Sequence, residues 1–485
     1  MSIPCPNPCN VLLVGGGGRE HALAWKLSQS PRLGKLYATD CSNGGIASLA
    51  LPCDETWNTD RIFFLNRWCD KHDIHLVVVG PEVPLAEGIA NELSTETRYV
   101  FGPKKEAARI EADKAYAKEL MHQASIPTAD ARSFTEANSA RQYVLRGLDR
   151  EFADDGNTNL ATEVERLIER LSDPQGWTFK ISDELYEIVK KRVDPCVVKA
   201  SGLAAGKGVI VCKTVLESLE AIQQIMDERS FGEAGGTILI EEFMEGQEVS
   251  VLALVDGRTI WVLDLCQDHK QVGEGDVGAN TGGMGAYSPA PLLDDDTMEY
   301  VEREILVPAV DGMRRDGIEF RGVLYAGLML TNAGPKVLEF NCRFGDPETQ
   351  PLMARLQGDL VDILWRTATG QLEGAEISFD ENVACCVVMC SAGYPGTYKK
   401  GLPISGIENA EVSNDVVVFH AGTDATGNEL TTSGGRVLGV TAIAKDLVTA
   451  RDQANDACSE IAFDGAFWRH DIGCRVLHDN VVDAT

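Results

Sequence analysis

A segment with two lysines and three glycines carries the residue types that bind a triphosphate. Lys199 opens the run KASGLAAGKG and Lys207 stands one residue before its end, between two apolar, strand-like stretches. A P-loop is excluded, because it has one more residue between its glycines and a Ser or Thr where this chain has Gly208. Backbone amides and lysines that face one ligand suit phosphate charge. The pattern predicts a flap, a strand–loop–strand hairpin that closes over a triphosphate; a hairpin with solvated lysines is the alternative.

A carboxylate and an amide stand two residues apart in an otherwise apolar run. Glu339 and Asn341 interrupt the sequence VLEFN, and side chains two residues apart in a strand point to the same face. Oxygen ligands of this kind suit Mg²⁺, which shares them with phosphates. Arg343 follows, and its guanidinium suits a carboxylate or a phosphate. We expect a magnesium site here; solvated polar groups at a strand end are the alternative.

A further apolar run ends in two acids, Glu241 and Glu242, and Glu248 begins the next run. We expect a hinge whose backbone near Glu242–Met244 meets an adenine edge, with Glu248 on the ribose hydroxyls. An acidic hairpin on an acidic surface is the alternative.

Two glycine-rich stretches flank these motifs. Residues 15–18 are four glycines between an apolar run and a helical pattern, where a helix N-terminus and Arg19 favour a phosphate. A dinucleotide fingerprint is excluded because Glu20 replaces its third glycine, and a tight structural turn is the alternative. Residues 267–291 open with Asp268, and their length is typical of a functional loop. The histidine that follows Asp268 is expected to be structural.

The elements that position these motifs predict an α/β and α+β multidomain fold. In the first hundred residues, apolar runs alternate with helical patterns, which indicates a Rossmann-like parallel sheet with ligands at the carboxyl ends of its strands. We expect this domain at residues 1–103, a second domain with the flap at 104–375, and a small α+β domain at 376–485. Residues 145–193 are charged and weakly periodic, which predicts a solvated insert with a helix or two.

Composition limits the partners of the chain. Its 485 residues carry 44 Lys and Arg against 74 Asp and Glu, a net charge of -30 that repels nucleic acids and anionic membranes. The 14 cysteines, several in apolar runs, are typical of reduced thiols in the cytoplasm, and no signal peptide or membrane span is recognised. We expect a cytoplasmic monomer that acts on small molecules. Serine-hydrolase, metalloprotease and zinc motifs are absent from the sequence.

Together, the motifs resemble those of the glycinamide ribonucleotide synthetase family of ATP-grasp ligases. The resemblance covers nearly the whole chain in order, apart from residues 145–193, and rests on these segments: VGGGGREHAL, VVGPEVPL, KASGLAAGKGV, IEEFMEGQE, QDHK, NTGGMGAYSP, EFNCRFGDPETQP and AGYPG. It implies an ATP-grasp fold at residues 104–375 and the reaction of ATP, glycine and 5-phosphoribosylamine to glycinamide ribonucleotide, ADP and phosphate. The implied intermediate is glycyl phosphate, and the implied pathway is purine biosynthesis.

The resemblance also implies roles for individual residues. The metal, Mg²⁺ or Mn²⁺, would bind Glu339 and Asn341. ATP would bind Lys114, Lys199, Lys207, Glu241, Glu242, Phe243, Met244 and Glu248. Phosphoribosylamine and glycine would meet Gly16, Gly17, Gly18, Arg19, Glu82, Asp268, Lys270, Asn280 and Arg343. Of these, Arg343 and Asp268 would hold the glycine carboxylate and the attacking amine, and Lys207 would complete the catalytic set.

The chain departs from this family pattern at two positions beside the lysines. The family commonly has serine where this chain has Asp113, and aspartate where it has Ser201. Both departures resemble biotin carboxylase, a relative in the same superfamily, whereas the segments near the acceptor do not. Two other functions stay open: an ATP-grasp ligase with another acceptor, and a nucleotide-binding regulatory protein without catalysis. A nicotinamide oxidoreductase would depend on the glycine loop alone and fails at Glu20.

Overall fold

The computed structural model describes residues 3–171, 181–204 and 207–477. The chain divides into two compact units. Unit 1 comprises Met1–Glu111, Gln123–Pro127 and Gly246–Thr485, and unit 2 comprises Ala112–His122 and Thr128–Glu245.

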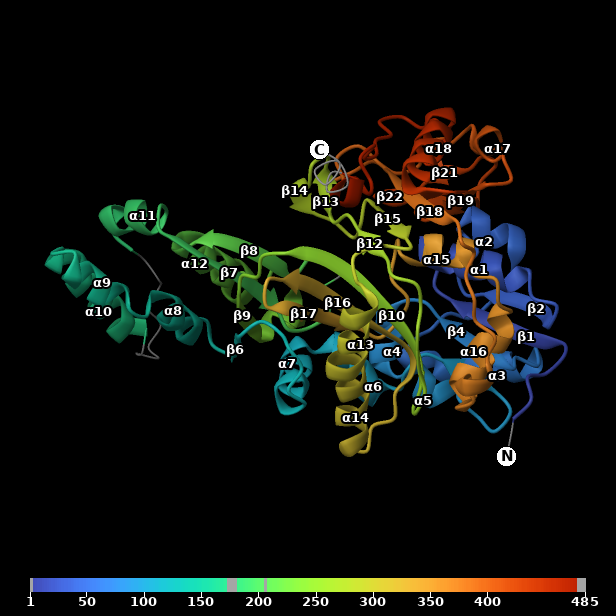
Figure 1. Cartoon of the computed structure of the whole chain (residues 1–485), viewed down its shortest axis with the longest axis horizontal. Helices are drawn as coiled ribbons and strands as arrows, with labels where there is room; N and C mark the ends of the chain where they lie inside the picture. The colour runs from blue at the N-terminus through green and yellow to red at the C-terminus, as the bar shows by residue number, and fades with distance from the viewer. Residues whose placement is uncertain (1–2, 172–180, 205–206, 478–485) are drawn as a thin grey trace. The chain divides into compact units, whose positions relative to one another are not determined.

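Unit 1 begins with a parallel sheet, drawn in blue in Figure 1. Its strands, in the order β3-β2-β1-β4-β5, are β1 (Cys9–Val14), β2 (Leu33–Ala38), β3 (Leu51–Pro52), β4 (Leu76–Val79) and β5 (Tyr99–Phe101). All neighbouring pairs are parallel. The helices among them are α1 (Gly18–Ser28), α2 (Gly44–Leu49), α3 (Ile62–Lys71), α4 (Glu82–Glu87) and α5 (Ile89–Leu93), and α6 (Lys105–Ala112) follows. The predicted parallel α/β sheet is confirmed, and the glycine loop and Glu82 follow the carboxyl ends of β1 and β4.

A second sheet of unit 1 is antiparallel and carries the predicted metal-binding strand. Its order is β11-β10-β16-β17, with β10 (Gln247–Asp256), β11 (Ile260–Val262), β16 (Arg321–Thr331) and β17 (Gly334–Asn341). The helices of this region are α13 (Asp295–Val301), α14 (Val307–Arg315), α15 (Thr349–Arg355) and α16 (Leu360–Thr369). The two strands expected between residues 322 and 341 are thus β16 and β17.

The third sheet of unit 1 joins distant parts of the chain. Its order is β12-β15-β18-β22-β19, with β12 (Gln267–Asp268), β15 (Gly285–Ser288), β18 (Val383–Cys390), β19 (Val416–His420) and β22 (Arg436–Ala444). Helices α17 (Ile407–Ala410) and α18 (Leu447–Glu460) accompany it, and two small ribbons lie beside it: β13 (Gln271–Gly273) with β14 (Val277–Asn280), and β20 (Thr423–Asp424) with β21 (Thr431–Thr432). The prediction of a loop over residues 267–291 is therefore wrong, because four short strands form there.

Unit 2 contains the predicted flap hairpin. Its antiparallel sheet has the order β6-β9-β7-β8, with β6 (Ala131–Phe134), β7 (Val193–Ala200), β8 (Val209–Thr214) and β9 (Ile238–Glu242). Helices α7 (Lys114–Gln123), α8 (Ala137–Leu145) and α12 (Val215–Ile222) belong to the same unit (Figure 1). Since β9 and β10 lie in different sheets, the acidic motif is not a hairpin but a connection from one unit to the other.

The insert was predicted to be a weakly periodic, solvated segment, but in the structure it forms helices that pack together. Its described part forms α9 (Leu148–Asp154), α10 (Thr158–Leu171) and α11 (Asp183–Val189), and residues 172–180 lie outside the described residues. Leu160, Val164, Leu167 and Leu171 are buried at helical spacing and belong to one apolar cluster with residues of α11 and α12. The composition of α10 is dominated by charged residues of its exposed face, but the spacing of its apolar residues is that of an amphipathic helix.

Among the described residues, no helix is both long and apolar enough to cross a membrane.

His21 of α1 is buried as a neutral imidazole. The backbone N–H of His420 donates to its Nδ1 at 2.8 Å, and the centroids of the two rings are 5.4 Å apart. Burial, with a smaller contribution from His420, lowers the pKa of His21 to about 3, and burial lowers the pKa of His420 to about 4. Between these values and about 6.5, the unfolded chain binds protons that the folded chain does not, so both residues reduce stability as the pH falls below about 6.5.

We therefore expect the variant His21→Gln to lose part of this pH dependence. In urea unfolding at pH 7, 6 and 5, the slope of the unfolding free energy against pH should decrease by about 1.4 kcal/mol per pH unit, the contribution of one titrating group. The matched control is His122→Gln, because the His122 side chain is exposed on α7; this variant should keep the wild-type slope. Equal slopes for His21→Gln and wild type would contradict the assignment.

Candidate active site

Glu339 and Asn341 share a face of the antiparallel sheet in unit 1. In the register of β16 with β17, Gly327 is opposite Glu339 and Tyr325 is opposite Asn341. The absent side chain of Gly327 leaves room, since a Cβ there would come 3.4 Å from Cγ of Glu339. Asn341 is buried, and its Oδ1 accepts a hydrogen bond from Arg343 at 3.3 Å. The strand thus presents a carboxylate and an amide oxygen side by side.

Glu248 and Lys270 form an ion pair that interacts with Glu339. The Nζ of Lys270 lies 2.8 Å from Oε2 of Glu248. Lys270 is the main cause of the lowered pKa of Glu248, whereas Glu339 opposes this shift. Burial lowers the pKa of Lys270, but Glu248, Glu339 and Asp268 together raise it above its ordinary value. The sequence motifs assign different roles to four residues that interact in the structure: Glu248, Asp268, Lys270 and Glu339.

Asp268 has a buried carboxylate oxygen that can accept a hydrogen bond. Its Oδ1 has no hydrogen-bond partner among the described residues. Burial, followed by the charge of Glu348, raises its pKa well above the ordinary value. Gly283 has a left-handed φ of +112°, and a Cβ there would come 2.7 Å from this oxygen. An amine or a hydroxyl could donate a hydrogen bond to this oxygen, and the predicted contact of Asp268 with the attacking amine stays a prediction.

Glu348 is a buried acid that the sequence reasoning missed. Its Oε1 accepts hydrogen bonds from the hydroxyls of Tyr325 at 2.5 Å and Ser250 at 3.2 Å. Glu348 lies five residues after Arg343 in the same motif, and this closeness in the sequence could have identified it as a site residue. The network fixes the sheet face that carries Asn341, because Tyr325 is its cross-strand partner.

Arg343 contacts two carboxylates. Its Nη2 lies 2.8 Å from Glu111 and its Nε lies 3.4 Å from Glu82. Although burial raises the pKa of Glu82, the charges of Arg343 and Arg19 bring it below the ordinary value. Glu111, in contrast, keeps a raised pKa because it is fully buried. Arg343 thus holds Glu82 and Asn341 in place, and its predicted contact with the glycine carboxylate stays a prediction.

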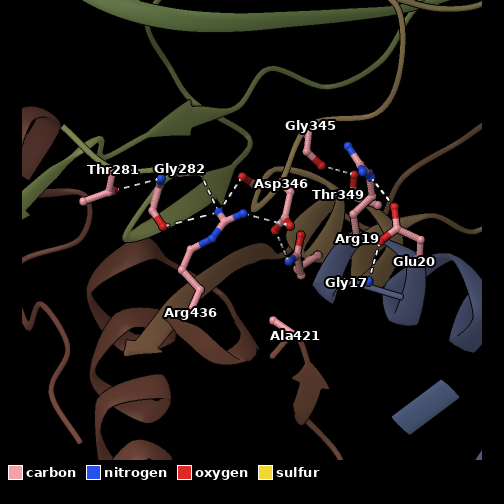
Figure 2. Close-up of polar contacts among 12 residues, drawn as sticks. Gly17, Arg19, Glu20, Thr281, Gly282, Gly345, Asp346, Thr349, Ala421 and Arg436 are labelled. Carbon is pink, nitrogen blue, oxygen red and sulfur yellow. Dashed lines mark hydrogen bonds and ion pairs between the residues drawn. The ribbon is translucent and has the colours of Figure 1, made fainter. Parts of the chain in front are cut away.

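The glycine loop is surrounded by acidic side chains (Figure 2). The carboxylate of Glu20 accepts the backbone N–H of Gly17 at 2.6 Å and pairs with Arg19 at 2.6 Å. A Cβ at Gly16 would come 2.3 Å from the carboxylate of Asp40, and one at Gly18 would come 2.8 Å from Nε2 of Gln350. A side chain at these positions would meet the end of a neighbouring acidic or amide side chain, so the loop is closely packed, and its predicted contact with phosphoribosylamine stays a prediction.

Arg436, from β22, connects the third sheet with the segments around this loop, as Figure 2 shows. It pairs with the Asp346 carboxylate at 3.0 Å and donates to the carbonyl oxygen of Gly282 at 2.5 Å. Asp346 also accepts from Gln350 at 2.8 Å. Asn280 lies apart from these contacts: it is exposed, and its Oδ1 accepts from Gln271 at 3.3 Å within the β13–β14 ribbon.

In unit 2, one buried glutamate pairs with two buried lysines. The carboxylate of Glu241 lies 2.8 Å from Nζ of Lys199 and 3.3 Å from Nζ of Lys118. Lys118 was missed by the sequence reasoning; burial lowers its pKa to about 8 despite the charge of Glu241. Two cations that share one anion make a positive centre suited to an anionic ligand.

The remaining residues of the predicted nucleotide site lie on the same unit. Lys207 is exposed on the flap, and its backbone N–H donates to Ala204. After β9, Phe243 is 41% exposed and Met244 is buried, whereas Glu242 pairs through its backbone with Asp130. The side chain of Glu241 faces the two lysines, so its predicted contact with adenine stays a prediction.

The two departures from the family pattern touch each other. The Ser201 hydroxyl donates to Asp113 Oδ1 at 3.0 Å and accepts the backbone N–H of Ala115 at 3.0 Å. Asp113 also accepts the backbone N–H of Tyr116 at 3.1 Å and so caps α7. The Nζ of Lys114 donates to the carbonyl oxygen of Gly202 at 3.3 Å. The pair thus ties the start of α7 to the start of the flap.

We expect the exchanged pair, Asp113→Ser with Ser201→Asp, to behave like the wild type. Serine at 113 and aspartate at 201 can make the same hydrogen bonds with the donor and acceptor reversed. Ser201→Asp should cost about 1–3 kcal/mol of unfolding free energy, because it places two carboxylates against each other. Asp113→Ser should cost less, because two hydroxyls can still share a hydrogen bond. Chemical unfolding of the three variants gives the coupling energy, and additive effects of the two single substitutions would contradict the pairing.

Family models and solved structures agree on what this chain is similar to. Its residues 9–111, 169–349 and 384–475 match the N, ATP-grasp (A) and C domains of phosphoribosylglycinamide synthetase. A phosphoribosylamine–glycine ligase of Rhodopirellula baltica is 45% identical over 472 residues, which is 96% of this chain and 98% of that protein. The crystal structure of the Thermotoga maritima phosphoribosylamine–glycine ligase is similar with a TM-score of 0.71, at 27% identity over 96% of this chain and 100% of that chain.

The fold is also shared with a more distant protein. The biotin carboxylase domain of the Hydrogenobacter thermophilus 2-oxoglutarate carboxylase, solved in complex with MgADP, has a TM-score of 0.62 at 16% identity, over 94% of this chain and 91% of that one. At this identity the likeness shows the ATP-grasp fold alone. The extent of the other matches is decisive: the chain belongs to the phosphoribosylglycinamide synthetase family, the ATP-grasp ligases that act as phosphoribosylamine–glycine ligases.

Proposed function

We propose that this protein joins glycine to 5-phosphoribosylamine in purine biosynthesis, with conversion of ATP to ADP and phosphate. Family membership over nearly the whole chain carries this conclusion. The glycine carboxylate would attack the γ-phosphate to give glycyl phosphate, and the amine of phosphoribosylamine would then displace the phosphate. The order of steps follows from the chemistry, because a carboxylate must be activated before an amine can attack it.

The described residues fit a divalent metal that is held jointly with phosphates. They contain no cluster of three or more His, Cys, Asp or Glu that would enclose a metal by itself, but Glu339 and Asn341 offer two oxygen ligands on one face. Mg²⁺ commonly takes one or two protein ligands and completes its shell with water and phosphate oxygens. When bound, the metal would neutralise charge on the phosphates as the carboxylate approaches. These hard oxygen donors suit Mg²⁺ and Mn²⁺ alike, so either ion is proposed.

The chain's own residues would bind and orient the substrates. Lys199, with Lys118 and Lys114, would hold the triphosphate, and the flap with Lys207 would exclude water from glycyl phosphate. Glu242–Met244 would line the adenine. Asp268, with its unpartnered oxygen, would accept a proton of the attacking amine in a hydrogen bond.

The remaining proposed substrate contacts lie on residues of unit 1. Glu82 and residues 16–19 would contact phosphoribosylamine; because Asp40, Glu20 and Asp346 lie near this loop, hydroxyl or amine groups suit it better than phosphate. Glu248 would reach the ribose of ATP only by leaving Lys270. Cytoplasmic location, the monomeric state and domain boundaries near residues 103 and 375 stay predictions.

A coupled assay for ADP with single omissions tests the proposal. Release of ADP should require ATP, glycine and freshly generated phosphoribosylamine together. Turnover with another amine in place of phosphoribosylamine would favour an ATP-grasp ligase with a different acceptor. Nucleotide binding without any turnover would favour a regulatory protein. Calorimetry with NADH should show no binding, which would exclude the oxidoreductase.

A further inference from the structure

The flap hairpin carries two cysteines that face each other. Cys196 of β7 and Cys212 of β8 are direct cross-strand partners in the antiparallel register. Such partners have Cα atoms roughly 4.5–5.5 Å apart, and a disulfide spans about 4.4–6.8 Å. The strands therefore hold the thiols at a separation that a disulfide can bridge.

The two thiols differ in access and acidity. Cys196 is partly exposed, whereas Cys212 is fully buried. The Sγ of Cys196 also lies 3.2 Å from Oγ of Ser218 on α12. The interaction with Cys212, and then the hydrogen bond with Ser218, lowers the pKa of Cys196 below its ordinary value in spite of burial. Because the thiolate is the nucleophile in thiol–disulfide exchange, Cys196 is suited to attack and Cys212 to resolve.

We propose that Cys196 and Cys212 form a reversible disulfide when the protein meets a low-molecular-weight disulfide such as glutathione disulfide. The Cys196 thiolate attacks one glutathione sulfur, forms a mixed disulfide and releases one glutathione. Cys212 then attacks the Cys196 sulfur and releases the second glutathione. Both thiol protons end on the two glutathione molecules, so the two cysteines are oxidised and one glutathione disulfide is reduced.

The position of this pair connects it with the flap. Cys196 precedes Lys199 by three residues, and Cys212 follows the last flap glycine by four. A disulfide would close a loop that contains the whole flap and would fasten β8, an edge strand of its sheet, to β7. We expect oxidation to restrain the flap and slow turnover. This consequence rests on the proposed function, whereas the disulfide itself does not.

Peptide mapping of the full-length protein tests the disulfide directly. The reduced protein is incubated with glutathione disulfide at neutral pH, its remaining thiols are alkylated, and it is digested with trypsin. Cleavage after Arg192, Lys199, Lys207 and Lys213 releases VDPCVVK and GVIVCK, each with a single cysteine. Mass spectrometry should show the two peptides joined, two hydrogens lighter than their sum, and dithiothreitol should separate them.

Variants and an internal comparison make the result specific. Cys196→Ser and Cys212→Ser should each lose the joined peptide, and Cys41→Ser, which removes another partly exposed thiol, should keep it. Cys5 and Cys9 also interact but lie on one tryptic peptide, so their oxidation is seen separately. If both flap peptides stay alkylated while the Cys5 peptide is oxidised, the proposal is overturned. The wild-type map alone decides this even if a variant does not fold.

The ADP assay separates the consequence for the flap from the disulfide. The oxidised wild type should turn over several-fold more slowly and recover with dithiothreitol, and Cys196→Ser should be insensitive to glutathione disulfide. A joined peptide with unchanged turnover would overturn the flap consequence. If even the reduced wild type released no ADP, the proposed function would have failed, and the mapped disulfide would still stand.

Discussion

Substitution of Glu339 with alanine is expected to abolish the release of ADP. The carboxylate shares one face of β17 with Asn341, and without it only an amide oxygen is left to bind the metal. A metal contributes several kcal/mol to the stabilisation of phosphoryl-transfer charge, so a loss of about 4 kcal/mol, roughly a thousandfold in turnover, is expected. The contacts expected around adenine lie on other residues, and binding of ADP without metal should be largely kept. Turnover and calorimetric binding of ADP measure the two effects.

Glu319→Ala is the matched control for this variant. It removes a glutamate of the same unit whose side chain is 58% exposed and pairs with Arg321 in a surface ion pair, and such pairs contribute little to stability. Its turnover should equal that of the wild type. Unchanged turnover in Glu339→Ala, or a loss of metal-free ADP binding as large as the loss of turnover, would remove the metal assignment.

The second large effect is expected for Lys199→Met. This change removes one of the two cations beside Glu241, and the loss of one charged contact to the phosphates should lower kcat/KM for ATP by about a hundredfold to a thousandfold. The fold should survive, because Lys118 still pairs with Glu241 at 3.3 Å. Steady-state kinetics at varied ATP, with thermal unfolding of the same preparation, check both statements.

Lys213→Met provides the comparison on the same hairpin. Lys213 lies on β8 and is exposed, whereas the lysines paired with Glu241 are Lys118 and Lys199. This variant should keep the wild-type kcat/KM. If both lysine variants were equally impaired, general charge on the flap, and not the buried centre, would explain the effect.

Local patterns in the sequence predicted the elements and several residues of the site. The alternation in VLEFN places Glu339 and Asn341 on one face, because strand geometry alone decides which side chains share a face. The same reasoning identified the β7–β8 hairpin and the parallel sheet. The spacing of Leu160, Val164 and Leu167 contains the periodicity of α10, but the charged residues between them obscured it, and the stretch was interpreted as weakly periodic.

Partners that are distant in the chain could not be predicted in this way. Glu111 is 232 residues from Arg343 in sequence, and their contact depends on the packing of α6 against the end of β17. Lys118 meets Glu241 through the fold of unit 2, and a single lysine in a helical pattern gives no signal of that ion pair. The contacts of Arg343 with two carboxylates also depend on tertiary packing, and they cannot be predicted from the spacing of residues in the sequence.

The third sheet of unit 1 has a practical consequence for dissecting the molecule. Its strands β12 and β15 come from residues 267–288, and the others come from residues 383–444. A recombinant fragment that starts near residue 376 would lack two of the five strands and would expose the side of β18 that normally pairs with β15. Such a fragment should be insoluble when expressed alone, and co-expression of the severed halves should rescue it only when the other half extends past residue 288.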